Sequence, residues 1–150
     1  MSKINHINII SVLLLLFISC SPTAQIGKFY TPEEANKLFG NVIYSVDLNT
    51  SVLSELLKKT EKSIMFGLID RQLIILDKHR NLIYPDKVEY KDTDVFTIYS
   101  TDAVSQLISN KGYGSQSENV SVEQRREVLS ISTENNTLEM GSKCPPFCLD

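Results

Sequence analysis

The sequence predicts one small α+β domain, in which an antiparallel-rich sheet is accompanied by about three short helices. Several segments alternate between apolar and polar residues or are almost continuously apolar, as strands are, and others repeat apolar residues at helical spacing beside recognisable caps. These segments follow one another in mixed order, without the steady alternation of a doubly wound sheet. The 150 residues suit a single domain. We find no internal repeat, and we expect the helices to pack against one face of the sheet.

The N-terminal nineteen residues contain an apolar run centred on residues 12–18. This run is shorter than the roughly 20 apolar residues that a membrane-spanning helix needs. Lys3 is the only charged side chain that precedes it. Both features are typical of a signal peptide, and we expect residues 1–19 to be removed on export.

The junction that follows reads Phe17-Ile18-Ser19-Cys20. It resembles the lipobox of bacterial lipoproteins, in which two bulky apolar residues and a small residue precede the lipidated cysteine, although Phe17 stands where the motif usually has Leu. The resemblance implies that Cys20 becomes the new N-terminus, carries acyl chains and holds the protein on a membrane. Ser21, in place of an aspartate, resembles lipoproteins that are forwarded to the outer membrane. The alternative is an ordinary secretory signal that is cleaved elsewhere.

Residues 20–30 hold Pro, Thr, Gln and Gly and few groups to bury, and we expect them to form a tether. The folded domain is then predicted to occupy residues 31–150. It begins with a helix, because Thr31 can cap, Pro32 suits the first turn and Glu34 completes a capping box. Gly40 is placed to end this helix.

The next two elements are a strand and a helix. Residues 42–48 alternate between apolar and polar side chains, the pattern of a strand with one buried face. Thr50 or Ser51 can cap the helix that follows, in which Val52, Leu53, Leu56 and Leu57 recur at helical spacing.

The middle of the chain predicts a buried hairpin, two further strands and a third helix. The hairpin joins the apolar runs 64–69 and 73–76 through Asp70-Arg71-Gln72. A short strand at 82–84 ends before Pro85, another spans 94–100, and a helix runs from Thr101 to about Gly112.

The C-terminal third predicts a surface loop and a last hairpin. Residues 110–121 are rich in Gly, Ser and Asn and have few apolar side chains, which is typical of a mobile surface loop that is either functional or disordered. Residues 126–132 and 137–140 form the hairpin around Glu134-Asn135-Asn136. The total is about six or seven strands. The mixed charges of residues 123–127 could bind an anion through the arginines, but we expect them to form a solvated face.

The chain has three cysteines, and lipidation of Cys20 leaves Cys144 and Cys148 as a pair. Outside the cytoplasm such a pair is expected to be oxidised. An extended Cys-Pro-Pro-Phe-Cys segment would separate the two Cα atoms by about 12 Å at ~3.1 Å per residue, whereas a disulfide needs them within about 7 Å. The bond therefore requires a tight turn, and it would act as a staple for the C-terminal tail.

Two sharper interpretations of Cys144 and Cys148 compete with the staple. An exposed, strained bond could take part in thiol–disulfide exchange. Three residues separate these cysteines, however, whereas thioredoxin-type proteins have Cys-x-x-Cys at the start of a helix. Both thiolates together with His79 could also hold a soft metal ion such as zinc or copper(I).

No motif selects a catalytic site, a cofactor or a phosphate loop, and the mature chain would hold a single histidine. The carboxylates of Asp86, Glu89, Asp92 and Asp94 lack the spacing of a calcium loop. The formal net charge of −3 argues against a nucleic-acid partner. We therefore predict a non-catalytic binding or structural protein of the cell envelope, with a membrane and an envelope protein as its partners and no cofactor. The alternative is a periplasmic thiol–disulfide or metal-handling protein that uses Cys144 and Cys148.

Overall fold

The computed structural model describes residues 25–109 and 118–144. These residues form the helices α2 (Pro32–Phe39), α3 (Thr50–Leu57) and α4 (Thr101–Ser109). They also form ten strands, which are β1 (Lys28–Tyr30), β2 (Tyr44–Asn49), β3 (Ser63–Ile69), β4 (Gln72–Leu76), β5 (Leu82–Tyr84), β6 (Phe96–Ser100), β7 (Asn119–Gln124), β8 (Leu129–Ser132), β9 (Thr137–Glu139) and β10 (Ser142–Cys144).

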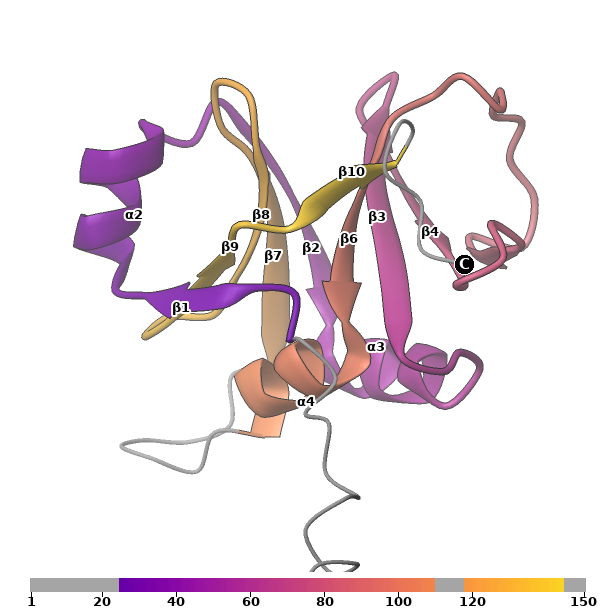
Figure 1. Cartoon of the computed structure of the whole chain (residues 1–150), viewed down its shortest axis with the longest axis horizontal. Helices are drawn as coiled ribbons and strands as arrows, with labels where there is room; N and C mark the ends of the chain where they lie inside the picture. Colours follow the sequence, from indigo (N-terminus) through magenta and orange to yellow (C-terminus); the bar gives the residue numbers. More distant parts are fainter. Residues whose placement is uncertain (1–24, 110–117, 145–150) are drawn as a thin grey trace, which may run out of the picture.

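The strands make two antiparallel sheets that face each other (Figure 1). The first sheet has the order β1-β9-β8-β7-β2 and the second has the order β10-β6-β3-β4-β5. The α+β class, the antiparallel-rich pairing and the three short helices are therefore confirmed. The helices do not share one face. α2 lies outside the first sheet, whereas α3 and α4 close one end of the molecule.

The order of elements repeats, contrary to the expectation of no internal repeat. The segment β2-α3-β3-β4-β5 and the segment β6-α4-β7-β8-β9 have the same succession of elements. Each sheet holds the last three strands of one segment and the first strand of the other, since β2 pairs with β7 and β6 pairs with β3. The only residual sequence similarity that we find lies in the helices, where Thr-Ser-Val-Leu-Ser-Glu-Leu-Leu matches Thr-Asp-Ala-Val-Ser-Gln-Leu-Ile.

The main hydrophobic core fills the space between the sheets and is closed by α3 and α4. Both sheets contribute alternate strand residues, and the two helices contribute Leu53, Leu56, Val104 and Leu107. A smaller cluster lies on the outer face of the second sheet and includes Met65, Ile74, Phe96 and Cys144. The second sheet is therefore buried on both faces, which explains why its β3 and β4 are almost continuously apolar.

The helix starts follow local capping chemistry. Thr31 Oγ1 accepts a hydrogen bond from the Glu34 amide at 3.2 Å, and Glu34 Oε2 accepts one from the Thr31 amide at 2.9 Å, which confirms the capping box. The cap of α3 is Asn49, whose Oδ1 accepts from the Ser51 amide at 2.9 Å, so the expected cap at Thr50 or Ser51 is wrong.

Three strands were not expected. β1 pairs with β9, so the proposed tether cannot extend to residue 30. β7 begins at Asn119 inside the predicted loop 110–121, whose first eight residues lie outside the described part of the chain. β10, which contains the last described residues of the chain, pairs with β6.

Gly141 permits the close crossing from β9 in the first sheet to β10 in the second. A Cβ atom at this position would clash with Thr97 Cγ2 and would lie 2.8 Å from the carbonyl oxygen of Ile98. Because the second contact is with backbone, only a residue without a side chain fits here without a shift of the strand.

In the described residues, no helix has the length and hydrophobicity that a membrane span requires.

Candidate functional site

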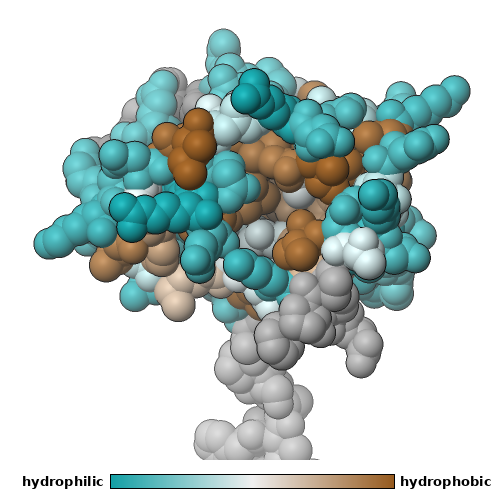
Figure 2. Space-filling view, turned by 90° about the horizontal axis from the view of Figure 1, so that it is seen from above, coloured by the Kyte–Doolittle hydropathy of each residue, from teal (hydrophilic) through white to brown (hydrophobic). Residues whose placement is uncertain are grey.

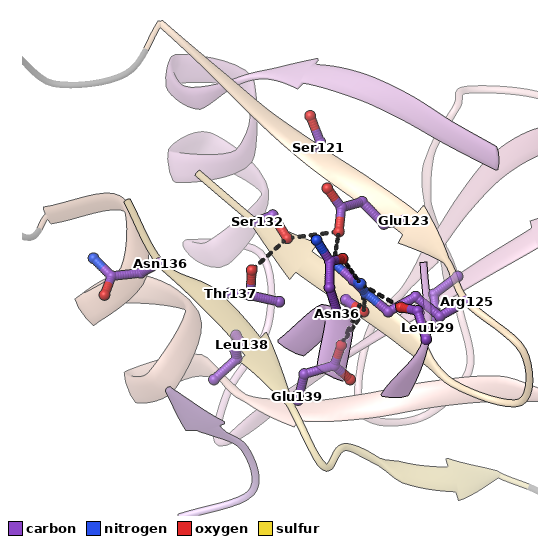
Figure 3. A network of polar contacts seen from close by, with 12 residues as sticks. Asn36, Ser121, Glu123, Arg125, Leu129, Ser132, Asn136, Thr137, Leu138 and Glu139 are labelled. Atoms are coloured by element: carbon purple, nitrogen blue, oxygen red, sulfur yellow. Dashed lines mark hydrogen bonds and ion pairs between the residues drawn. The ribbon is translucent and has the colours of Figure 1, made fainter. Parts of the chain in front are cut away.

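A network of buried polar side chains lies between the first sheet and α2 (Figure 3). In β7, β8 and β9, alternate residues point into the core, and the residues between them point outward, toward α2. The outward residues are polar, namely Glu123, Ser130, Ser132, Thr137 and Glu139. The outer face of this sheet is thus a polar surface that a helix covers.

Arg125, which directly follows β7, is the centre of this network and is 2% exposed. Its Nη1 donates to Asn36 Oδ1 at 2.6 Å and to the carbonyl oxygen of Gly40 at 2.7 Å, both in or next to α2. Its Nη2 lies 2.7 Å from Glu123 Oε2, and its Nε lies 3.2 Å from Glu139 Oε1. The guanidinium group therefore joins α2 to β7 and β9.

Three hydroxyl groups complete the network. Ser130 receives a hydrogen bond from Arg125 Nε at 3.0 Å and donates to Glu139 Oε1. Ser132 donates to Glu123 Oε2 at 2.8 Å and is also within 3.1 Å of Thr137 Oγ1. These contacts satisfy most of the buried polar atoms, as the low dielectric of a protein interior requires.

Glu139 is the exception, since its Oε2 is buried and has no hydrogen-bond partner among the described residues. Burial raises the pKa of this carboxyl group, and the hydrogen bond from Ser130 and the charge of Arg125 oppose that rise only in part. The network therefore contains one carboxyl group that is easier to protonate in the folded chain than in the unfolded chain.

The expectation that residues 123–127 form a solvated face is wrong for Arg125. The sequence carried a signal for the polar face on which Arg125 lies, because β7 and β8 alternate Val, Leu and Ile with Glu and Ser. Such alternation predicts one apolar and one polar face. It does not reveal that a helix from residues 32–39 covers the polar face, which depends on the tertiary fold.

The network holds α2 in place. Ala35 is the only residue of α2 that is buried, and Leu38 is 61% exposed. The edge-to-face contact of Tyr30 with Phe39, at 5.3 Å between ring centroids, adds some apolar packing. Since apolar contacts are few, the hydrogen bonds from Arg125 supply much of the attachment of this helix.

The predicted cysteine sites are only partly described. Cys20 and Cys148 lie outside the described residues, so the lipid attachment and the disulfide stay predictions. Cys144 is buried, and its Sγ accepts a hydrogen bond from Arg80 Nη1 at 3.2 Å. The same guanidinium group donates to the carbonyl oxygens of Asp92 and Asp94 and lies 5.1 Å from the ring centroid of Phe96. Arg80 thereby fastens the 85–95 segment to β6 and β10.

The turn that carries Arg80 is shaped by Asp77, whose Oδ1 accepts from the amides of His79 and Asn81, both at 2.8 Å. Burial opposes ionisation of Asp77, but the hydrogen bonds from Asn81 and His79 together hold its pKa below the ordinary value. The His79 side chain itself is exposed. Over residues 25–109 and 118–144, no three His, Cys, Asp or Glu side chains are arranged to hold a metal ion.

Two open hollows lie at the end of the molecule closed by α3 and α4. One is lined by Asn49, Ser51, Ser54, Ser105 and Ser109. The other is lined by Gln25, Lys62, Thr101 and Asp102, and it shares Ser105 and Ser109 with the first. Hydroxyl and amide groups contribute much of their walls, and none of the described residues directs a buried charge into either hollow.

The opposite end of the molecule exposes apolar side chains. β2 and β6 run toward α3 and α4, so the residues that precede them lie at the far end. These residues are Val42, Ile43 and Val95, which are 40%, 69% and 53% exposed. Figure 2 looks onto this end and shows hydrophobic side chains gathered in the middle of a hydrophilic rim. We call the surface formed by Val42, Ile43 and Val95 the apolar end.

Comparison of the chain with protein-family models, curated proteins and solved structures finds no match. The class of protein that the structure itself defines is a small α+β domain with two facing antiparallel sheets and an internally paired ionic network.

We predict that Arg125→Met lowers the free energy of unfolding by about 3–5 kcal/mol, because it leaves buried carboxylates without their cation. Arg126→Met is the matched control, since Arg126 is the exposed next residue and its replacement should change stability by about 0.5 kcal/mol or less. Urea unfolding of both variants measures the difference. Equal stabilities of the two variants would contradict the assigned role of Arg125.

We also predict that Glu139→Gln becomes more stable relative to the native chain as the pH rises. The raised pKa of Glu139 means that the folded chain binds this proton more tightly, so the contribution of this group to native stability is largest below the ordinary carboxyl pKa and falls until the pH exceeds the folded value. The slope cannot exceed about 1.4 kcal/mol per pH unit for one proton. Unfolding curves recorded between pH 4 and pH 8, at intervals on the order of one pH unit, measure this slope. Glu127→Gln, at an exposed position, is the control. If the stability of Glu139→Gln and that of the native chain changed with pH in the same way, the raised pKa of Glu139 would be refuted.

Proposed function

We propose that this protein is an envelope lipoprotein, anchored through Cys20, with a non-catalytic binding role toward another envelope protein. The observation that carries the anchor is the Phe17-Ile18-Ser19-Cys20 junction at the end of an apolar run. Two or more acyl chains on one cysteine bind a bilayer stably, whereas a single chain does so only marginally. Ser21 supports the outer membrane as the destination.

The proposed partner surface is the apolar end. Exposed apolar side chains that gather inside a polar rim are typical of protein contact sites. Tyr44 reinforces this end, because its hydroxyl donates to the carbonyl oxygen of Arg71 at 2.8 Å and so links β2 of the first sheet to the β3–β4 turn of the second. A surface supported in this way can be presented to a partner with little rearrangement.

Thiol–disulfide exchange is the rival function, and the burial of Cys144 weighs against it. An attacking thiolate must reach a sulfur atom, and the Sγ of Cys144 is enclosed beside Arg80. Exchange would therefore have to begin at Cys148. This favours the staple interpretation of the pair.

The anchor is tested by the intact mass of the protein extracted from the membranes of its native host, with and without thiol alkylation. The expected mass corresponds to residues 20–150 with acyl chains on Cys20 and two cysteines that resist alkylation until they are reduced. A mass without acyl chains would refute the anchor. Cysteines that are alkylated without reduction would favour the exchange or metal function over the staple.

The binding role is tested by a photo-crosslinking residue at Ile43 in lipidated protein on native membranes. We expect one adduct of defined mass, which is lost when Val42 and Val95 are both replaced by Glu. The matched control places the same crosslinker at Glu33, an exposed position on α2. Identical adducts from both positions, or none from Ile43, would refute the apolar end as the contact site.

A further inference from the structure

We propose that the domain rests on the phospholipid headgroup layer through its α3–α4 end, defined by α3, α4 and the turn Lys58–Lys62, so that the apolar end points away from the membrane. This inference rests on the proposed anchor at Cys20 and adds an orientation and a lipid contact to it.

The first argument is the place where the chain enters the domain. The carbonyl oxygen of Ile26 accepts hydrogen bonds from the amide of Ser100 at 3.1 Å and from its Oγ at 3.2 Å. Ser100 is the last residue of β6 and directly precedes α4. Gln25 lines a hollow there together with Lys62 and Thr101. The N-terminal side of the domain is thus fixed at the α3–α4 end.

The second argument is the length of the connection. Five residue steps separate Cys20 from Gln25, and fully extended chain spans at most about 18 Å over five steps. β3 runs from the α3–α4 end to the apolar end, and its six steps cover about 20 Å. A lipid at Cys20 therefore favours the α3–α4 end as the membrane-facing end, because the connection would have to be fully extended along the side of the domain to bring the apolar end to the bilayer.

The third argument is the chemistry of the α3–α4 end. Its exposed side chains include Ser51, Lys59, Lys62, Ser105 and Gln106. Hydroxyl, amide and ammonium groups can donate hydrogen bonds to the phosphate and carbonyl oxygens of headgroups. Acidic side chains are interspersed, since Glu55 pairs with Lys58 at 2.6 Å and Asp102 lies in the first turn of α4. This nearly balanced charge fits a zwitterionic headgroup layer and needs no anionic lipid.

The chain contains no tryptophan, so a single introduced tryptophan reports its own position. We would place it at the exposed Ser105 of α4, at the exposed Gln72 at the start of β4, and at the exposed Glu33 of α2, in three separate lipidated full-chain proteins. Each is reconstituted into vesicles of brominated phosphatidylcholine, whose bromine atoms quench nearby tryptophan, and into unbrominated vesicles. Gln106→Trp serves as a second reporter on α4 if Ser105→Trp does not fold.

We expect bromine to quench the α4 reporter and to leave the Gln72→Trp emission unchanged, with the same result when phosphatidylglycerol is added. Quenching of Gln72→Trp, equal quenching at all positions, or no quenching of the α4 reporter would overturn the orientation. Quenching of Glu33→Trp alone would indicate that the domain lies on α2 and would overturn it too. A strict requirement for phosphatidylglycerol would overturn the zwitterionic contact. The intact native mass tests the anchor separately, so an acylated protein with the wrong quenching pattern contradicts only this inference.

Discussion

The guanidinium group of Arg125 is the constraint on which the N-terminal part of the fold depends. It reaches α2 through Asn36 and Gly40, and it reaches β7 and β9 through Glu123 and Glu139. Removing an arginine and two glutamates from water is costly, and a buried ionic group is weak evidence for high stability. The rigid planar fork of an arginine nevertheless fixes directions that an apolar contact would leave free. We interpret the network as the element that determines where α2 sits on the sheet.

In the proposed function, the two ends of the molecule have different roles. The end closed by α3 and α4 receives the chain from the proposed lipid, whereas the apolar end lies about 20 Å away along β3. The two ends are joined by a core that runs the full length of both sheets.

Local sequence signals were sufficient for the elements that form their own contacts. The α2 capping box, the β3–β4 hairpin and the short strand before Pro85 were all predicted. The strands β1, β7 and β10 were not predicted, because they are short or mainly polar and form only by pairing with distant strands. The site was missed for the same reason, since Arg125 and Glu139 look like surface residues until α2 covers them.

The repeated order of elements has a consequence for how this chain reaches its native state. Each half contributes its first strand to the sheet built from the other half, so β2 completes β7-β8-β9 and β6 completes β5-β4-β3. Neither half can finish a sheet alone, and contacts between residues far apart in sequence must form together. The two halves of the chain therefore exchange strands, as the two protomers of a domain-swapped dimer do. A nick in the 85–95 connection would leave two fragments that remain bound to each other through three strand pairings, β1 with β9, β2 with β7 and β3 with β6.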